Sequence, residues 1–239
     1  MSEVECFRVR QARREDLPGL FLLRSMAYER TVDAFNHRDL RKDDPSTLVF
    51  MVEDHRGASQ ILPYQGPIAA VNLKIARNIV DLDAKLEVCK TELINKGIGN
   101  PFKRVHGVVL VASRLVVHPT ARRLGISRML RAFMHEVFQN IPEADALMGL
   151  TADDGSNPIP ALLRRIPQYR LWPIQTNRAI FPGQQVVYRL SRPNLQNANH
   201  RLRELQGNSP FPSYEWAGER RSISWRNTQF DGQAVDSLW

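Results

Sequence analysis

The sequence predicts an α/β fold, of the α+β kind with a mixed sheet, and three observations lead to this prediction. Short apolar segments typical of strands alternate along the chain with longer amphipathic segments typical of helices. The strongest strand pattern, at 105–118, is followed directly by the strongest helix pattern, at 122–140. The chain has 239 residues, 43% of them hydrophobic, which is enough for one substantial core.

The first half of the chain begins with a strand and a helix. Residues 5–12 alternate apolar and polar side chains, as a half-buried strand does. Residues 13–30 have apolar side chains at helical spacing, and Glu15 and Asp16 favour a helix N-terminus. We expect, in order, a strand at 5–12, a helix at 13–30, a polar loop at 31–46, strands at 47–53 and 67–77 joined by an extended connection at 54–66, and an amphipathic helix at 78–96.

The second half begins with the longest apolar strand pattern in the sequence. Residues 108–111 are all apolar, which predicts a strand buried on both faces. The helix that follows, from about Arg122 to Asn140, has one apolar stripe for the core. The remaining elements expected are a strand at 144–151, a short helix at 160–166, and strands at 168–172 and 184–190 that complete the sheet.

The composition changes after residue 190. Residues 194–239 are rich in Asn, Gln, Arg, Ser, Gly and Pro, with isolated aromatic residues. The polar residues are typical of a poorly ordered tail, whereas the aromatic residues favour a segment that docks on the domain or on a partner. We therefore expect an α/β domain at 1–190 and a partly ordered or docking C-terminal extension at 191–239.

Charge and composition narrow the classes of partner. The formal net charge of +8 suits a phosphorylated cofactor, an acidic carrier protein or nucleic acid. The 33 Lys and Arg residues form no dense run, so charge by itself does not indicate a nucleic-acid-binding protein. Two cysteines, Cys6 and Cys89, argue against a disulfide scaffold or a cysteine-rich metal site, and we expect no metal.

The sequence also bears on location. No apolar run approaches the ~20 residues that a helix needs to cross a bilayer. The first residues carry acidic side chains and lack the basic and apolar regions of a secretory signal. We therefore expect a cytoplasmic protein without a membrane span.

Residues 113–130 hold the most specific pattern in the chain. They are expected to run from the buried strand through a short turn into a helix whose first turn contains Gly125 and Ser127. At such a junction several backbone N–H groups point at one place, and the helix macrodipole adds positive potential. Arg122, Arg123 and Arg128 bring further positive charge. The pattern predicts a site for an anionic, phosphate-bearing cofactor.

This segment resembles the GNAT superfamily of N-acyltransferases. The pyrophosphate signature of that family is Arg/Gln-x-x-Gly-x-Gly/Ala, after a strand that ends in Val-x-Pro. This chain has Val117-His118-Pro119 and then Arg122-Arg123-Leu124-Gly125-Ile126-Ser127, with Ser127 where Gly or Ala is usual. The resemblance implies a GNAT-like fold that uses acetyl-CoA or another acyl-CoA.

The resemblance also implies which residues bind the acyl-CoA. The backbone of Val116 and Val117 would contact the pantetheine arm and the thioester, and the N–H groups of residues 123–127 would bind the diphosphate. The cofactor-binding residues expected on this basis are Val116, Val117, Arg122, Arg123, Leu124, Gly125, Ile126, Ser127, Arg128 and Asn157.

The acid–base residues of the family match less well. Many GNAT enzymes have a Glu at the position of Val111, so a base here must come from elsewhere, or water suffices. Ser113, on the same strand face as Val111, is one candidate, with a hydrogen-bonded core hydroxyl as the alternative. His118 is another, because its pKa suits proton transfer, with an exposed loop histidine as the alternative. Asn157 is followed by leucines and not by the family's Tyr acid, for which Tyr169 is a weak substitute.

A second resemblance is to acyl-homoserine-lactone synthases and N-acyl amino acid synthases. Their strand carries Glu-x-Ser-Arg-Phe/Leu, and this chain has Val111-Ala112-Ser113-Arg114-Leu115, without the Glu. Those families also place an Arg on the first helix and acidic residues before the second strand. Arg24, Asp43 and Asp44 are the corresponding substrate-binding candidates, and a substrate carboxylate would suit Arg24 or Arg114. The alternative for Arg24 is a solvated helix face.

These patterns lead to one expected function and three alternatives. We expect an N-acyltransferase that moves an acyl group, with acetyl as the expected one, from acyl-CoA to a small amine, with Ser113, Arg114, His118 and Tyr169 as catalytic candidates. The first alternative is a synthase of the second kind, which would use an acyl carrier protein docked on the basic surface. The second is a GNAT-like DNA-modifying enzyme, and the third is a noncatalytic binding module, which Val111 and Leu163 would favour.

Overall fold

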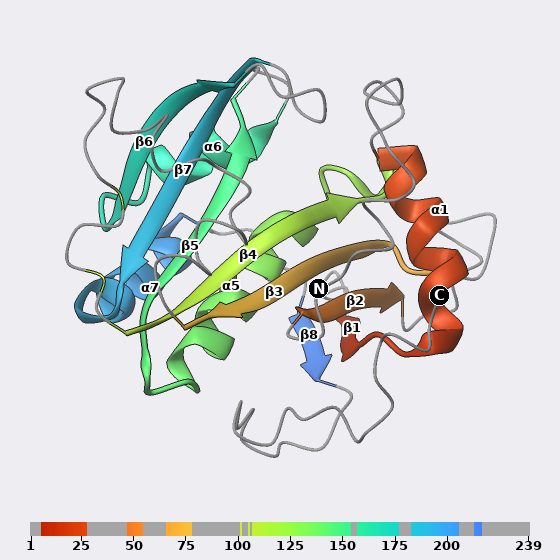
Figure 1. Cartoon of the computed structure of the whole chain (residues 1–239). Coiled ribbons are helices and arrows are strands. Elements are labelled where there is room, and N and C mark those ends of the chain that lie inside the picture. The colour runs from red at the N-terminus through yellow and green to blue at the C-terminus, as the bar shows by residue number, and fades with distance from the viewer. Residues whose placement is uncertain are drawn as a thin grey trace. The chain divides into compact units, whose positions relative to one another are not determined.

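A computed structural model shows a mixed sheet of eight strands, in the order β6-β7-β5-β4-β3-β2-β1-β8 (Figure 1). The structure describes residues 6–27, 47–54, 66–77, 101, 105, 107–153, 157–176, 183–205 and 213–216. The expected loop at 31–46, the helix at 78–96 and most of the connection at 54–66 lie outside these residues. Within them, no helix combines the length and the apolar character that a membrane span requires.

Parallel and antiparallel pairs both occur in the sheet, which confirms the predicted fold class. Strands β1/β2, β5/β7 and β6/β7 pair antiparallel, while β4/β5 and β1/β8 pair parallel. The strands are β1 Cys6–Gln11, β2 Thr47–Asp54, β3 Ala69–Ala76, β4 Val108–Val117, β5 Ala144–Ala152, β6 Tyr169–Thr176, β7 Gly183–Ser191 and β8 Ser213–Trp216. The helices are α1 Leu17–Ala27, α5 Ile126–Gln139, α6 Pro158–Arg164 and α7 Leu195–Glu204, with 3-10 turns η1 Arg14–Asp16, η3 Pro119–Ala121 and η4 Arg192–Asn194.

The chain folds as two compact units. The first comprises Met1–Leu73, Arg114–Phe133 and Gln206–Trp239, and the second comprises Lys74–Ser113 and Met134–Leu205. The boundary expected at residue 190 stays a prediction. Of the extension, the structure describes η4 and α7 in the second unit and β8 in the first.

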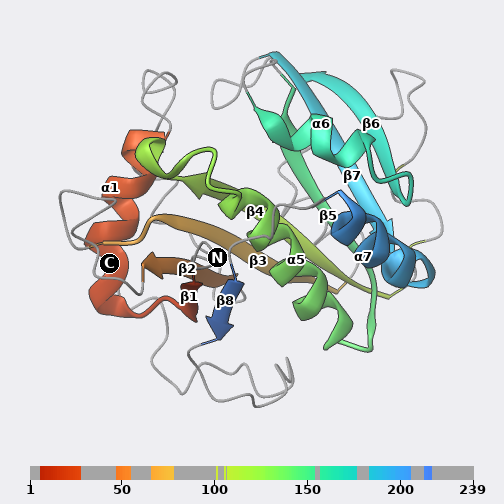
Figure 2. The ribbon, with the colours of Figure 1, turned by 180° about the vertical axis from the view of Figure 1, so that it is seen from behind.

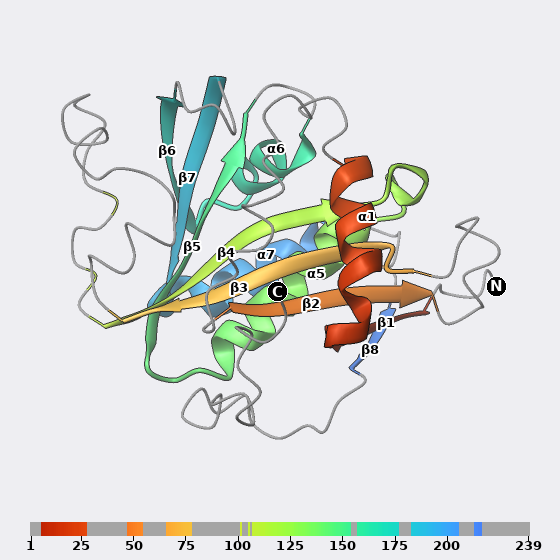
Figure 3. The ribbon, with the colours of Figure 1, turned by 45° about the vertical axis from the view of Figure 1, so that its right-hand side comes forward.

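In the first unit, α1 packs on the strands through an apolar cluster. The cluster joins Leu20 and Leu23 of α1 to Met51 of β2, Ala70 of β3 and Val116 of β4. Figure 3 shows α1 running across β2 and β3. Burying such side chains contributes roughly 1.5–3 kcal/mol each, so this cluster fixes α1 on the sheet.

The first strand also carries an ion cluster that ties it to its neighbours. Phe7 and Val9 are buried and Arg8 is exposed, as the expected alternation requires. Arg10 donates bidentately to Asp16 at 2.6 Å for both bonds, and to Glu53 of β2 at 2.7 and 3.0 Å. The cluster links β1, η1 and β2, so it positions the start of α1.

In the second unit, the core joins β4–β7 to the last residue of β3 and to Val105. It comprises Ala76, Val105, Val109, Val111, Ala146, Met148, Ile174 and Val187. Both α6 and α7 lie on the face of β5, β6 and β7 that is turned toward the viewer in Figure 2. Helix α6 begins two residues earlier than expected, because Asn157 caps it and Pro158 is favourable in a first turn.

Candidate anion-binding site

The site begins at an irregularity in β4. The parallel ladder with β5 runs from Val108↔Ala144 to Ala112↔Gly149, and β4 itself continues to Val117. Arg114 has a φ of 49°, which is uncommon for a residue other than glycine. Such a conformation interrupts the alternation of an extended strand, so the pattern of residues 108–112 does not continue unchanged through 114–117.

Gly149, which forms the last pair of that ladder, must be glycine. A Cβ at this position would overlap the Tyr188 hydroxyl and lie 2.5 Å from the carbonyl oxygen of Ala112. The side chain of Tyr188, itself 3% exposed, occupies the space above Gly149. Sequence reasoning missed this pair, because the close approach of β7 to β5 leaves no local signal.

After β4 the chain makes the 3-10 turn η3 and then a short loop. The turn is closed by the Ala121 N–H, which donates to the His118 carbonyl at 2.9 Å, and by the Arg122 N–H, which donates to Pro119 at 3.3 Å. Two residues of the loop then have left-handed conformations, Arg123 with φ 75° and Gly125 with φ 80°. Helix α5 therefore starts at Ile126 and not at about Arg122, which corrects the expected boundary.

The loop presents five consecutive backbone N–H groups, those of residues 123–127, which we call the 123–127 amides. Within the part of the chain that the structure describes, none of these five groups donates a hydrogen bond to the protein. The next two, of Arg128 and Met129, both donate to the Gly125 carbonyl at 3.0 Å. Successive N–H groups joined through left-handed residues form a concave anion-binding nest, and here the N-terminus of a 14-residue helix adds its dipole.

The charge around this loop is positive. Arg122, Arg123 and Arg128 are exposed, and the Arg122 guanidinium also donates to the carbonyl of Ala27 at 3.4 Å. Leu124, Gly125 and Ser127 are partly exposed, whereas Ile126 is buried at 1% and anchors the helix start. The residues predicted from the phosphate signature thus lie together on one loop, with donors that lack internal acceptors.

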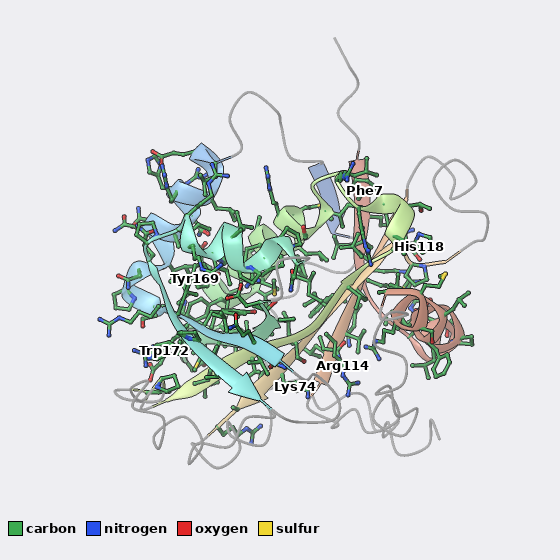
Figure 4. All side chains as sticks on the ribbon, turned by 90° about the horizontal axis from the view of Figure 1, so that it is seen from above. Phe7, Lys74, Arg114, His118, Tyr169 and Trp172 are labelled. Carbon is green, nitrogen blue, oxygen red and sulfur yellow. The ribbon has the colours of Figure 1, made fainter. Side chains whose placement is uncertain are left out.

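His118 lies where β4 meets η3 (Figure 4). It is only 5% exposed, so the alternative of an exposed loop histidine is wrong. Its Nδ1 lies 2.7 Å from Thr120 Oγ1 and accepts the Thr120 N–H at 3.3 Å. Burial, with a smaller contribution from the charge of Arg122, lowers the pKa of His118 below its ordinary value and so favours the neutral ring.

Ser113 precedes the irregular residue Arg114 on β4. Its Oγ is buried and has no hydrogen-bond partner among the described residues. A buried hydroxyl without a partner costs free energy, which makes it a candidate for contact with a ligand. Val111, two residues earlier, is fully buried in the core of the second unit.

Arg24 of α1 is buried at 4% exposure, which contradicts the solvated helix face considered from the sequence. Its Nη2 donates to Oδ1 of Asn72 on β3 at 2.7 Å, and Asn72 is fully buried. Sequence reasoning missed Asn72, because it lies 48 residues away within an apolar strand. The other two substrate-binding candidates, Asp43 and Asp44, lie outside the described residues.

Tyr169 and Asn157 both belong to the second unit. The Tyr169 hydroxyl lies 2.5 Å from Nε2 of His135, and Tyr169 is 5% exposed. Asn157 Oδ1 accepts the Ile159 N–H at 3.0 Å, while its Nδ2 donates to Thr151 Oγ1 at 2.8 Å and to Ala152 O at 3.1 Å. The amide of Asn157 therefore joins the end of β5 to the start of α6. Over the described residues, no group of three or more His, Cys, Asp or Glu side chains is placed to hold a metal ion.

Comparisons with known proteins agree with the expected fold. No protein-family model matches the chain, and no curated protein sequence matches it. Three solved structures are similar to it over most of their length. The first is FeeM, an N-acyl amino acid synthase from uncultured soil microbes, at 10% identity over 80% of this chain and 94% of that one, with a TM-score of 0.53. The second is a CoA-dependent acyl-homoserine lactone synthase, BjaI, with SAM and isopentyl-CoA, at 12% identity over 97% of this chain and 98% of that one, with a TM-score of 0.53. The third is Arabidopsis thaliana NAA60 with acetyl-CoA, at 14% identity over 78% of this chain and 99% of that one, with a TM-score of 0.51.

At these identities the similarity concerns the fold. The chain has the fold of the GNAT acyltransferases and of the two kinds of acyl synthase, as its sequence resemblance implied.

Proposed function

We propose that the chain is an N-acyltransferase that takes an acyl group from acyl-CoA and transfers it to the amine of a small acceptor. The observation that carries the proposal is the set of 123–127 amides, which have no acceptor among the described residues. An anionic group at this place would satisfy them, and Arg122, Arg123 and Arg128 would add charge attraction. The GNAT-type fold supports the proposal, and acetyl is the expected acyl group.

The number of the donors favours a diphosphate over a single phosphate. The 123–127 amides are five consecutive N–H groups, and a diphosphate offers more acceptor oxygens to them than a single phosphate does. Coenzyme A brings a diphosphate, whereas the phosphopantetheine arm of a carrier protein brings one phosphodiester. We therefore favour coenzyme A as the donor and keep the acyl carrier protein as the alternative.

In the reaction, the acceptor nitrogen forms a bond to the thioester carbonyl carbon, the C–S bond breaks, and the amine proton ends on the thiol. The backbone of Val116 and Val117 is proposed to hold the arm and the carbonyl. Ser113, whose hydroxyl is buried and has no partner among the described residues, is proposed to orient a water or the leaving thiolate. Arg114 and Tyr169 stay catalytic candidates.

A second candidate is a synthase that acylates an amino acid or a related substrate. The buried position of Arg24, held by Asn72 at 2.7 Å, favours it, because a fixed guanidinium suits a carboxylate. Asp43 and Asp44 stay proposed substrate-binding residues. Acceptors with and without a carboxylate distinguish this candidate from simple amine acylation.

The test is turnover with a mixed acyl-CoA pool and an amine panel that includes amino acids, polyamines and a DNA oligonucleotide. The acceptor is identified by the mass that it gains. If amino acids gain the mass of the acyl group only when their carboxylate is free, the result supports the synthase. If the DNA oligonucleotide gains this mass, the result supports a DNA-modifying enzyme. Coenzyme A binding without any turnover would contradict an enzyme and favour a binding module.

The role of charge is tested by a matched pair of variants. Arg128→Gln removes a charge beside the 123–127 amides, while Arg13→Gln removes the same charge from a side chain that is 73% exposed and contacts Glu15 at 3.7 Å. We expect Arg128→Gln to raise the Kd for coenzyme A about two- to fivefold at low salt, as the screened attraction at a helix N-terminus implies. Equal effects of the two variants would contradict this role of Arg128.

A further inference from the structure

The backbone of His118 is held on both sides at the start of the anion-binding loop. Its backbone N–H donates to the Ile68 carbonyl at 2.8 Å, which fixes the residue against the segment that enters β3. Its carbonyl accepts the Ala121 N–H at 2.9 Å, which closes η3. Four residues separate His118 from Arg123, so η3 lies directly before the 123–127 amides in the chain.

The ring contact is chemically specific. A backbone N–H can only donate, so the contact of the Thr120 N–H with Nδ1 at 3.3 Å requires a lone pair on Nδ1. The Thr120 hydroxyl, 2.7 Å from the same nitrogen, then donates as well. The proton of the neutral ring therefore sits on Nε2, and Nδ1 is occupied as an acceptor.

The same contact reproduces a known turn geometry. In an Asx-turn, the side-chain oxygen of Asp or Asn accepts the N–H two residues further along the chain. The imidazole Nδ1 of His118 does this for Thr120 across Pro119, which has no N–H to donate. This contact sets the direction in which the chain leaves β4.

We infer that His118 is a positioning residue, which orients the anion-binding loop through Nδ1, and not the general base of the reaction. This inference deepens the proposed function and rests on it. A base would need an accessible lone pair, whereas Nδ1 is engaged by Thr120 and Nε2 is buried and carries the proton. Removing the contact frees η3 to rotate, which turns the 123–127 amides away from a common anion.

The first test uses the wild-type protein without any ligand. Long-range ¹⁵N–¹H NMR spectra of the His118 ring report which nitrogen carries the proton. We expect an unprotonated Nδ1 and a protonated Nε2 at pH 7.5. A proton on Nδ1 would overturn the inference whether or not the chain binds coenzyme A.

The second test compares three substitutions at one position. In His118→Asn the amide oxygen lies near the place of Nδ1 and restores the acceptor, in His118→Gln the amide lies near the place of Nε2, and His118→Ala removes both. Because one hydrogen bond contributes a net ~1 kcal/mol, we expect Ala and Gln to raise the Kd for coenzyme A roughly fivefold, and Asn to recover most of that loss. In turnover, the KM for acyl-CoA should follow the Kd, with kcat nearly constant.

Each outcome decides between roles. A fall in kcat that is equal in all three variants would contradict the inference, because Asn restores the turn but cannot accept a proton. Loss of affinity in Asn as large as in Ala would also contradict it. A wild-type protein that binds no coenzyme A would contradict the proposed function instead, while the NMR spectrum would still decide the state of the ring.

Discussion

The Tyr169 hydroxyl lies 2.5 Å from Nε2 of His135, and Nδ1 of the same ring lies 2.6 Å from Oδ1 of Asn199. The chain of three groups joins β6, α5 and α7 within the second unit. Both rings are buried, and Tyr169 also packs edge-on against Tyr188 with ring centroids 5.8 Å apart. This environment gives the Tyr169 hydroxyl a structural role, whatever its role in catalysis.

Removing that hydroxyl should therefore cost stability. In Tyr169→Phe the ring of His135 loses a buried partner, so we expect the free energy of unfolding to fall by about 1–3 kcal/mol. Urea unfolding measures it. In the double variant Tyr169→Phe/His135→Leu both partners are apolar, so its loss should be smaller than the sum of the two single losses. Strict additivity of the two losses would contradict the coupling.

The ion cluster of Arg10 predicts a pH dependence of stability. Burial raises the pKa of Asp16, but hydrogen bonds from Arg10 and from the Arg13 N–H, with the charges of both residues, outweigh it and lower that pKa below 3.8. A folded-state pKa below the unfolded one stabilises the protein above about pH 3.8, and this stabilisation is lost as the pH falls further through the folded value.

We therefore expect Asp16→Asn to lower the free energy of unfolding by about 1–2 kcal/mol near neutral pH, with a difference that shrinks below pH ~4. Urea unfolding of both proteins across this pH range measures it. Glu15→Gln is the control, because Glu15 is 70% exposed and its contact with Arg13 is 3.7 Å long. A deficit of Asp16→Asn that stays constant down to pH 2 would exclude titration of Asp16 as the cause.

Arg192 closes the C-terminus of α5. Its guanidinium donates to the carbonyls of Phe138 and Ala144 at 2.8 Å and also to that of Ile141, and it lies 4.3 Å from the centre of the Phe138 ring. Phe138 lies in the last turn of α5, where carbonyls have no partner further along the helix. Arg192→Lys keeps the charge but loses the planar fork of donors, so we expect a loss of about 1–2 kcal/mol in the free energy of unfolding.

The control for that variant is Arg164→Lys in the same unit. Arg164 is 52% exposed and pairs with Asp153, so its replacement should change stability by less than about 0.5 kcal/mol. Thermal or urea unfolding of the two variants gives the comparison. Equal losses would mean that the carbonyl contacts of Arg192 contribute nothing beyond those of an exposed ion pair.

Gly125 links the loop conformation to ligand affinity. Its φ of 80° is accessible to glycine and tolerated by Asn, but it is strongly unfavourable for a β-branched residue. We expect Gly125→Val to raise the Kd for coenzyme A by about tenfold or more, because the left-handed conformation costs an L-residue roughly 1–2 kcal/mol. Gly125→Asn, of similar size to Gly125→Val, should recover much of the affinity. Calorimetry measures both Kd values. An equal loss of affinity in the two variants would show that the size of the side chain, and not the backbone conformation, causes the loss.

Much of the fold was predictable because the alternation of apolar residues reports burial directly. The strands β1 to β5 and β7 fall close to the expected ranges, and the stripe of α5 from Ile126 onward is buried as expected. Strand β6 continues to Thr176, beyond the expected end at 172. The start of α5 was not predictable from the stripe, because the stripe does not reveal that Arg123 and Gly125 are left-handed. The residues of the phosphate signature lie on that loop and at the start of α5, and their role in binding a cofactor stays a prediction.

The polar contacts of the site were less predictable, because their partners are distant in sequence. The burial of Arg24 depends on Asn72, and the position of Tyr169 depends on His135 and Asn199, which lie 34 residues before and 30 residues after it. His135 sits within the apolar stripe of α5, where its neighbours gave no sign of a polar contact. The contact of His118 with Thr120 is local, and the proline between them was the available signal.

The central claim is that the 123–127 amides bind a diphosphate. The most direct measurement is a ¹⁵N–¹H NMR titration of the wild-type protein with coenzyme A and, separately, with pantetheine, which lacks the diphosphate. We expect coenzyme A to shift the amide resonances of residues 123–127 strongly and pantetheine to leave them nearly unchanged. Resonances that stay in place with coenzyme A, or that move equally with both compounds, would contradict the account.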